Sequence, residues 1–296
     1  MLSSVKYINM KLSVVLATRN EEENIERCLE SIKSIANEII IFDEYSTDRT
    51  KEIAEKFGAK VFLEPHHDIF HITKQKAIDM AKGDWILQLD ADEVVSPELS
   101  MEIQGIINHE VTSSAYNQSP IIKQNKLFDR HQKLIEQRNG PIGKQDGEVV
   151  AYFIPRRNMF LGKPLIHAGV YPDGVIRLIR KGKAYLPAKS VHEQMVIDGK
   201  VGWLNGDLLH FDSPTLSRYL NRLNRYTDLK AQELKSSKTP KNLWSFLQFT
   251  ILHPTYYFLL LFIRHLGFLD GVNGFLWSFF SALHFPIAYF KYITNK

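Results

Sequence analysis

The sequence has a single cysteine, a small net charge and no glycine-rich nucleotide-binding motif. Cys28 is the single cysteine, which excludes an intrachain disulfide framework and fits a reducing compartment. Because it falls within an amphipathic helical pattern, Cys28 is expected to be a small buried core residue. The formal net charge of +4 is too small to argue for nucleic acid as a partner. Neither GxGxxG nor a P-loop pattern occurs, which disfavours a dinucleotide-binding fold and a P-loop enzyme.

Two stretches near the end of the chain lack charged side chains altogether. Residues 242–263 and 271–290 contain no Asp, Glu, Lys or Arg, and each is about long enough to cross a bilayer. Polar interruptions, with Pro254 in the first and Pro286 in the second, favour interfacial or re-entrant helices over simple spans. A buried apolar subdomain or the interface of a homo-oligomer is the alternative. The N-terminus does not read as a signal peptide, because its apolar run at 12–17 is short and precedes charged residues.

Apolar runs and helical patterns alternate along the first hundred residues. Strands are expected at 12–16, 38–42, 60–63 and 85–89. Helices are expected from a capping box at Asn20, from Ser46 to Gly58, and over 73–82. This alternation predicts a mainly parallel sheet flanked by helices. In open sheets of this kind, ligands bind beyond the carboxyl ends of the strands.

The later part of the chain is less regular until a basic helix near residue 213. A helix is expected within 123–138, and strands at 152–154 and 174–179. Ser213-Pro214 predicts the start of a helix, with proline at its first position. Its expected apolar face comprises Leu216, Leu220, Leu223, Tyr226 and Leu234. Residues 214–241 hold seven Lys and Arg, and Arg218, Arg222 and Arg225 form a separate stripe that is either a solvated face or a lipid-facing one.

Polar clusters follow three of the predicted strands. They are Thr18-Arg19-Asn20, Asp43-Glu44 and Asp90-Ala91-Asp92. Alternation along a strand points Asp90 and Asp92 the same way. Converging carboxylates repel unless a cation or hydrogen-bond donors lie between them, and hard oxygen ligands suit Mg²⁺ or Mn²⁺ held together with substrate phosphates. A solvated turn is the alternative reading of this Asp-x-Asp.

The order, spacing and residues of these motifs resemble the family 2 glycosyltransferases. Residues 13–22 read SVVLATRNEE, residues 42–50 read FDEYSTDRT and residues 81–93 read AKGDWILQLDADE. Later segments look like the branch that includes lipopolysaccharide-core β-glucosyltransferases; they are residues 154–158, 162–163, 169–173, 177–178, 191–193 and 267–271. The resemblance implies a GT-A fold and an inverting transfer from a nucleotide-activated sugar.

The resemblance also implies which residues hold the donor. The residues it assigns to the nucleotide sugar are Thr18, Asn20, Glu22, Asp43, Lys74, Asp90 and Ala91. A carboxylate accepts the imide N–H of uracil, so Asp43 favours a uridine donor. A helix-capping role for Asp43 and a solvated helix lysine at Lys74 are the alternatives. The chain departs from many relatives in having Glu44 after Asp43.

A divalent ion and a base complete the expected site. Mg²⁺ or Mn²⁺ would neutralise the leaving diphosphate. The expected ligands are Asp92, Asp90 and His210, and a core histidine is the alternative for His210. Inversion needs a base for the acceptor hydroxyl, and position within the family favours Glu193, ahead of Asp173 and Asp146. The alternative for Glu193 is that it orients His192 or a loop.

We therefore expect a GT-A catalytic domain over 1–212, with a donor half at about 10–100 and an acceptor half at about 101–212. A basic amphipathic helix over 213–241 and hydrophobic membrane-associated helices over 242–296 follow. The expected enzyme moves a hexose, with glucose as first choice, from a UDP-sugar to a lipid-linked or lipid-anchored glycan of the cell envelope. It would act at the cytoplasmic face of the cell membrane.

Two other classes of protein are weighed against this reading. A catalytically silent homologue would serve as a membrane-bound scaffold, although the acidic residues of the expected site are all present. A sugar-phosphate nucleotidyltransferase shares the α/β layout. Its glycine-rich, arginine-containing first loop is missing here, because Thr18-Arg19-Asn20 occupies that place.

Overall fold

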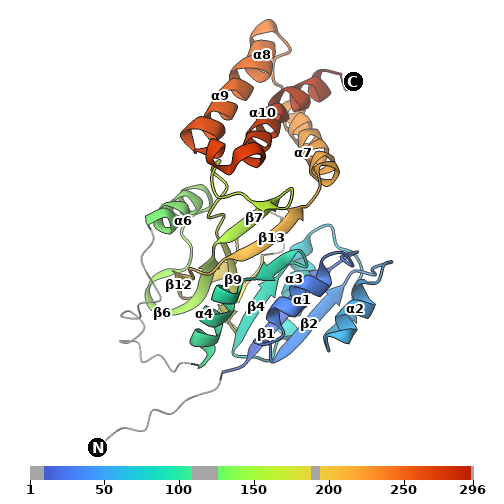
Figure 1. The fold of residues 1–296 in the computed structure, drawn as a ribbon, viewed down its shortest axis with the longest axis vertical. Helices are drawn as coiled ribbons and strands as arrows, with labels where there is room; N and C mark the ends of the chain where they lie inside the picture. The colour runs from blue at the N-terminus through green and yellow to red at the C-terminus, as the bar shows by residue number, and fades with distance from the viewer. Residues whose placement is uncertain (1–9, 109–125, 188–193, 295–296) are drawn as a thin grey trace, which may run out of the picture. The chain divides into compact units, whose positions relative to one another are not determined.

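The computed structural model describes residues 10–108, 126–187 and 194–294, which fall into two compact units (Figure 1). The sheet unit is Met1–Arg156 with Pro172–His210. The helical unit is Arg157–Tyr171 with Phe211–Lys296.

A seven-stranded sheet forms the centre of the sheet unit. Its strands, in spatial order, are β12 (Lys200–Trp203), β6 (Lys144–Ile154), β9 (Val175–Arg180), β4 (Trp85–Leu89), β1 (Leu12–Thr18), β2 (Glu38–Asp43) and β3 (Lys60–Leu63). Strands β4, β1, β2 and β3 pair in parallel, whereas β9 runs antiparallel to both β4 and β6. The mainly parallel α/β fold expected from the sequence is confirmed, and the carboxyl ends of four strands share one edge.

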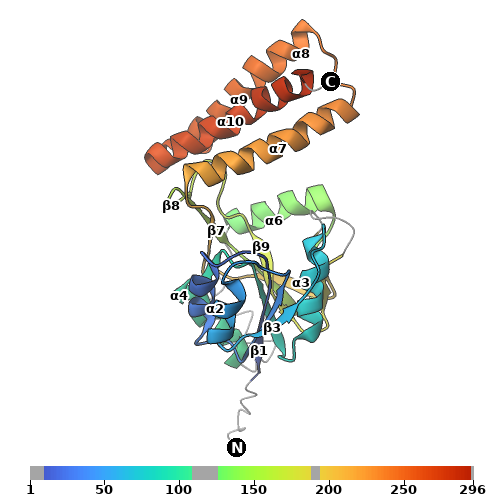
Figure 2. The same cartoon turned by 90° about the vertical axis from the view of Figure 1, so that its right-hand side faces the viewer.

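Helices cover both faces of this sheet. They are α1 (Ile25–Ile32), α2 (Thr50–Lys56), α3 (Phe70–Met80), α4 (Pro97–Asn108) and α6 (Lys126–Asn139). Figure 2 views the sheet nearly edge-on and shows α2 and α4 on one face and α3 on the other. This two-sided cover explains why β4 is buried along its whole length and β1 at every position but Ala17, and why their sequences are mainly apolar rather than alternating.

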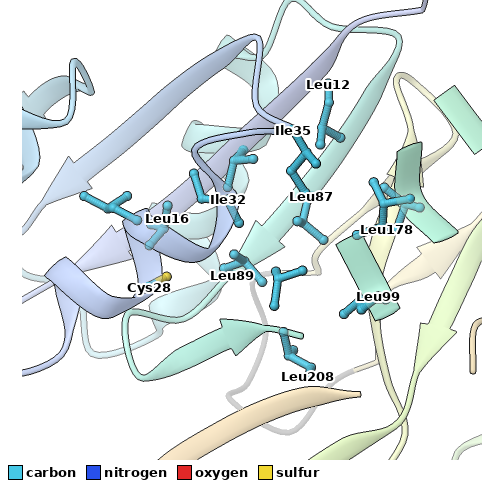
Figure 3. Close-up of a cluster of buried hydrophobic side chains, with 14 of the residues drawn as sticks. Leu12, Leu16, Cys28, Ile32, Ile35, Leu87, Leu89, Leu99, Leu178 and Leu208 are labelled. Atoms are coloured by element: carbon cyan, nitrogen blue, oxygen red, sulfur yellow. The ribbon is translucent and has the colours of Figure 1, made fainter. Parts of the chain in front are cut away.

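The main apolar core lies between the sheet and the helices α1 and α4 (Figure 3). Leu16 of β1, Ile32 of α1 and Leu99 of α4 are all fully buried. Cys28 belongs to the same core, as its helical spacing predicted. Burial of each large apolar side chain stabilises the fold by about 1.5–3 kcal/mol, so this core fixes the sheet edge that carries the polar clusters.

Close backbone approach brings β4 beside β1. A Cβ atom added at Gly83 would lie 2.6 Å from the carbonyl oxygen of Lys11, so only glycine fits at this position. The register that follows pairs Leu12 with Trp85 and Leu16 with Leu89. The Asp-x-Asp segment therefore begins level with the end of β1.

The remaining described strands are short and form two smaller sheets. They are β5 (Glu93–Val95), β7 (Arg156–Phe160), β8 (Lys163–Pro164), β10 (Ala184–Tyr185), β11 (Val196–Ile197) and β13 (Leu208–Ser213). Strand β13 pairs antiparallel with β5, which places His210 opposite Glu93. This pairing brings a residue from late in the chain to the segment that follows β4.

The helical unit is built from α7 (Leu216–Ser236), α8 (Leu243–Leu247), η1 (Gln248–Leu252), α9 (His253–Leu259), η2 (Leu260–Arg264), η3 (Gly267–Asp270) and α10 (Gly271–Thr294). Helix α10 packs against both α7 and α9. The run from Leu243 to Arg264 is continuous, and by length and composition alone it could cross a membrane. Phe160, Tyr219 and Trp277 form an aromatic cluster inside this unit.

Several helix boundaries differ from those expected from the sequence. Helix α1 begins at Ile25, because Asn20 has a left-handed φ of 55° and its side chain accepts a hydrogen bond from the backbone of Thr47 instead of capping the helix. Helix α7 begins at Leu216, because the side chain of Thr215 caps it by accepting from the backbone of Arg218. Pro214 therefore precedes the helix.

The apolar face assigned to α7 is largely wrong. Leu216, Leu220 and Tyr226 are exposed. The buried side chains of the helix are Tyr219, Thr227, Ala231 and Leu234. Periodicity alone could not choose between these two stripes, because both present apolar or aromatic residues at helical spacing.

Candidate functional site

The ends of β1 and β2 are joined by hydrogen bonds. Thr18 and Asp43 are paired in the parallel ladder, and the Thr18 hydroxyl donates to the Asp43 carboxylate at 3.0 Å. The backbone and hydroxyl of Ser46 donate to the same carboxylate at 2.8 and 2.6 Å. Asp43 is 1% exposed, so in this structure its carboxylate holds the β2–α2 loop against β1.

Asn20 and Glu22 connect the same two loops. The Asn20 side chain accepts from the backbone N–H of Thr47 at 2.8 Å. The Glu22 carboxylate accepts from the backbone N–H of Arg49 at 3.0 Å. Both residues therefore brace the loops beyond β1 and β2, and their predicted contacts with a nucleotide base stay predictions.

A pocket of about 380 Å³ lies at this edge of the sheet. Its described lining residues are Ala17, Thr18, Arg19, Glu21, Glu44, Phe70, His71, Lys74, Asp90, Ala91, Asp92 and His210. The structure thus brings together six of the predicted site residues: Thr18, Lys74, Asp90, Ala91, Asp92 and His210. Asn20, Glu22 and Asp43 are not among its described lining residues, and Glu22 lines a separate pocket with Arg49.

Two cations compensate the first carboxylate of the Asp-x-Asp segment. The Lys74 ammonium lies 2.5 Å from one oxygen of Asp90, and the Arg177 guanidinium lies 2.5 Å from the other. Burial alone would raise the pKa of Asp90, but the charges of Arg177 and Lys74 outweigh it and hold that pKa well below its ordinary value. Asp90 is therefore an ionised carboxylate with both oxygens already paired.

Arg177 also binds the residues on either side of the motif. It donates to Glu93 at 2.6 Å and to the side-chain oxygen of Gln88 at 2.5 Å. Arg177 is only 8% exposed. Glu93 in turn accepts from the backbone N–H of Asp90 at 2.9 Å. A guanidinium donates several hydrogen bonds in fixed directions, so Arg177 sets the shape of the turn that follows β4.

Asp92 and His210 form a second pair in the pocket. The His210 Nε2 atom lies 3.5 Å from a carboxylate oxygen of Asp92. Burial opposes ionisation of Asp92, but its hydrogen bond and charge interaction with His210 dominate and lower the pKa of Asp92. No group of three or more His, Cys, Asp or Glu suited to a metal occurs within the described ranges.

The Asp92–His210 pair suits a divalent ion whose coordination shell is completed by the substrate. One carboxylate and one imidazole supply two ligands, and Mg²⁺ and Mn²⁺ sites of this kind take their remaining ligands from water and phosphate oxygens. Asp90 fits a metal less well, because Lys74 and Arg177 occupy its two oxygens. The residues present therefore fit a metal held through Asp92 and His210.

The predicted base, Glu193, lies outside the described residues, as does His192. Of the weaker choices, Asp173 accepts two hydrogen bonds from the guanidinium of Arg156, at 2.9 and 2.7 Å. Asp146 is exposed on β6. An arginine-paired carboxylate is a poor proton acceptor, so Asp173 serves better as a structural partner of Arg156.

Sequence reasoning missed the roles of Arg177, Arg156 and Glu93. Arg177 was present in a family-like Arg-Leu pair, but no role was assigned to it. Its position in the middle of the strand Val175–Arg180, where its neighbours at 175–179 are all apolar, could have identified it, because a charge on a buried strand needs a partner. Glu44, part of the expected Asp43-Glu44 cluster, lines the pocket, and Phe70 lines it without having been expected there.

These features define an α/β enzyme with an acidic, cation-compensated pocket at the carboxyl edge of its parallel strands. Residues 13–169 match the family described as Glycosyl transferase family 2. The chain belongs to this family and is a glycosyltransferase.

Relatives align along nearly the whole chain. An uncharacterised glycosyltransferase of Rickettsia typhi is 29% identical over 281 residues, which cover 92% of this chain and 83% of the relative. The lipopolysaccharide core biosynthesis glycosyltransferase LpsC of Rhizobium meliloti is 27% identical over 288 residues, which cover 92% and 91%. The predicted resemblance to lipopolysaccharide-core enzymes of family 2 is confirmed.

Solved structures are similar at lower levels. The mannosyltransferase PcManGT of Pyrobaculum calidifontis, in complex with GDP-Man and Mn²⁺, has a TM-score of 0.46 and 12% identity, covering 99% of this chain and 90% of that one. Glucosyl-3-phosphoglycerate synthase of Mycobacterium tuberculosis, in complex with Mn²⁺, UDP-glucose and phosphoglyceric acid, has a TM-score of 0.26 and 28% identity over 29% of this chain and 34% of that one. These similarities carry no argument about the donor or the metal of this chain, and both are assigned from its own residues.

Proposed function

We propose that the chain is an inverting, divalent-metal-dependent hexosyltransferase that uses a UDP-sugar, with UDP-glucose as first choice. Its acceptor would be a lipid-linked or lipid-anchored glycan of the cell envelope, a class suggested by the similarity to LpsC. The observation that carries the proposal is the pocket in which Asp92 and His210 lie together with Thr18 and Lys74. A carboxylate–imidazole pair and a lysine ammonium in one pocket suit a metal-bound diphosphate.

The cation would be held by Asp92 and His210, and it would neutralise the charge that develops on the leaving diphosphate. Lys74 lies in the same pocket and supplies a second positive charge. When a diphosphate enters, its oxygens compete with Asp90 for the Lys74 ammonium, while Arg177 continues to pair Asp90. Asp90 is thereby placed to accept from a donor hydroxyl.

A base must take the proton of the acceptor hydroxyl while the anomeric bond forms and the bond to the diphosphate breaks. Glu193 remains our proposed base by its position in the family. The Arg156 pairing of Asp173 supports this choice over Asp173. Inversion follows because a single displacement attacks the face opposite the leaving group.

A donor screen by thermal shift tests the proposal. We expect UDP together with Mn²⁺ to raise the Tm by about 5–10 °C at one hundred times its Kd, because ligand binding at that excess contributes about 2.7 kcal/mol. GDP and dTDP serve as matched nucleoside diphosphates, each with and without Mn²⁺. A larger shift with GDP, or the same shift with UDP in the absence of a divalent ion, would contradict the proposed donor or metal.

The helical unit would attach the enzyme to the cytoplasmic face of the cell membrane. It contains twelve Lys and Arg against four Asp and Glu, although the whole chain has a net charge of only +4. No part of the apolar window in Leu243–Arg264 is buried, and Trp244 and Tyr256 are 64% and 61% exposed. Exposed apolar and aromatic side chains next to excess positive charge are complementary to an anionic lipid bilayer.

Vesicle flotation of the full chain tests this attachment. We expect strong binding to vesicles that contain phosphatidylglycerol and weak binding to neutral vesicles. Lys235→Gln and Lys238→Gln should each weaken the anionic binding by about fivefold, because one basic residue near the surface contributes about 1 kcal/mol. Lys51→Gln and Lys56→Gln in the sheet unit are the matched controls. Equal partitioning of the wild-type chain onto neutral and anionic vesicles would argue against the charge complementarity.

A further inference from the structure

A histidine–aspartate pair lies in the helical unit, outside the donor pocket. Asp270 accepts from the backbone N–H groups of Ile166 and His167, at 3.1 and 2.8 Å, and its other oxygen lies 2.8 Å from the His167 Nδ1 atom. The Asp270 side chain is 7% exposed and that of His167 is 33% exposed. This arrangement fixes the imidazole with Nδ1 directed at the carboxylate and leaves Nε2 for another partner.

The backbone around this pair is held in unusual conformations. Ala168 and Leu266 have left-handed φ values of 54° and 58°, and the Ala168 N–H donates to the carbonyl of His265 at 2.9 Å. A Cβ atom at Gly274 would lie 1.9 Å from the carbonyl oxygen of Gly267, so glycine is required where α10 meets η3. Non-glycine residues in left-handed conformations persist where surrounding contacts enforce them, and they cluster at functional sites.

Arg264 adds a second cationic group to this region. It precedes His265, whose carbonyl is bonded to the residue after His167. Arg264 is exposed, and within the described part of the chain no carboxylate pairs with it. Asp270 already accepts three hydrogen bonds, so it has little capacity left to neutralise a second cation.

Exposed apolar side chains flank these polar groups along the chain. Ile166, Leu266, Phe268 and Leu269 are between 37% and 56% exposed. Each is adjacent in sequence to His167, His265, Gly267 or Asp270. A cationic group among exposed apolar side chains matches a molecule with an anionic head and an apolar chain.

We propose that His167 and Arg264 form a binding site for the phosphate of a membrane lipid. The imidazole would lie between Asp270 and a phosphate oxygen, with Nδ1 toward the carboxylate and Nε2 toward the phosphate, and the Arg264 guanidinium would donate to the same phosphate. A purely structural clamp would need only the two backbone N–H groups on Asp270, whereas the imidazole of His167 is one-third exposed and has a second ring nitrogen that does not contact Asp270. The inference rests on the proposed membrane attachment of the helical unit.

Vesicles that match in charge but differ in phosphate test the site. We expect the full chain to bind neutral-lipid vesicles doped with phosphatidic acid more tightly than vesicles given the same negative charge by cholesteryl hemisuccinate, whose anion is a carboxylate. His167→Gln and Arg264→Gln should each reduce binding to the phosphatidic acid vesicles by about fivefold, while binding to the carboxylate vesicles changes less. Thermal melts check that both variants remain folded.

Arg218→Gln is the matched control, because it removes a partly exposed positive charge from α7. It should weaken binding to both kinds of vesicle equally. If wild-type protein binds neither kind, the membrane attachment itself is wrong. If wild type binds but His167→Gln and Arg264→Gln behave like Arg218→Gln, the phosphate site is wrong. Retention of the phosphate preference by both variants would also overturn it.

Discussion

Replacing Asp92 by asparagine is expected to lower the rate of hexose transfer by at least about a hundredfold. The substitution keeps the size of the side chain and removes the negative charge that, with His210, would hold the divalent ion. A metal that neutralises a leaving group contributes several kcal/mol to transition-state stabilisation, and each 1.36 kcal/mol is a factor of ten in rate. The measurement is kcat and the Mn²⁺ concentration at half-maximal activity, with the donor that the thermal-shift screen identifies.

Asp198→Asn is the control for this experiment. Asp198 is an exposed carboxylate of the sheet unit, paired with Lys144 and Lys183, and it does not line the pocket. We expect its loss to leave transfer within about twofold, because exposed ion pairs contribute little. Equal activity of Asp92→Asn and wild type would remove the proposed metal site and would favour a scaffold role for the chain.

Arg177→Gln is expected to lower the free energy of unfolding by about 3–5 kcal/mol and to abolish donor binding. The substitution leaves Asp90 and Glu93 without their shared guanidinium, and removing one partner of a buried ion pair leaves an uncompensated charge. Loss of the contacts to Gln88 and Glu93 would also release the turn that presents Asp92. Urea denaturation and the UDP–Mn²⁺ thermal shift measure the two effects.

Arg180→Gln on the same strand is the matched control. Arg180 pairs with the exposed Glu148, so its replacement should change the free energy of unfolding by less than about 1 kcal/mol. Arg177→Lys keeps the charge without the guanidinium geometry, and we expect it to recover part of the stability but little of the donor binding. An Arg177→Gln protein as stable as Arg180→Gln would show that Asp90 and Glu93 do not depend on Arg177.

The fold was largely predictable because its first half follows local rules. The runs at 12–16, 38–42, 60–63 and 85–89 all form strands, since each is an apolar segment bounded by turn residues. Helix starts were less predictable, because Asn20 forms a long-range hydrogen bond that competes with capping. The exposed face of α7 depends on its packing against α10, which no local pattern reveals.

The candidate site was predictable where it depends on strand order alone. Parallel strands end at one edge, so Thr18, Asp90 and Asp92 were expected to meet there, and they do. Arg177 reaches the same place from an antiparallel strand far along the chain, and that pairing has no sequence rule. The expected role of Asp90 as a metal ligand likewise depends on whether cations already occupy its oxygens, which only the structure reveals.

The buried thiol of Cys28, next to the Asp-x-Asp segment, gives the molecule a native reporter group. The Cys28 sulfur lies 3.7 Å from the backbone oxygen of Asp90. Burial, followed by the charges of Glu93 and Asp92, raises the pKa of this thiol well above its ordinary value. In the folded protein, alkylating reagents therefore meet a protonated sulfur that they cannot reach. Their reaction rate reports how often α1 separates transiently from the segment after β4. With no other cysteine in the chain, each labelled molecule records that event at one known position.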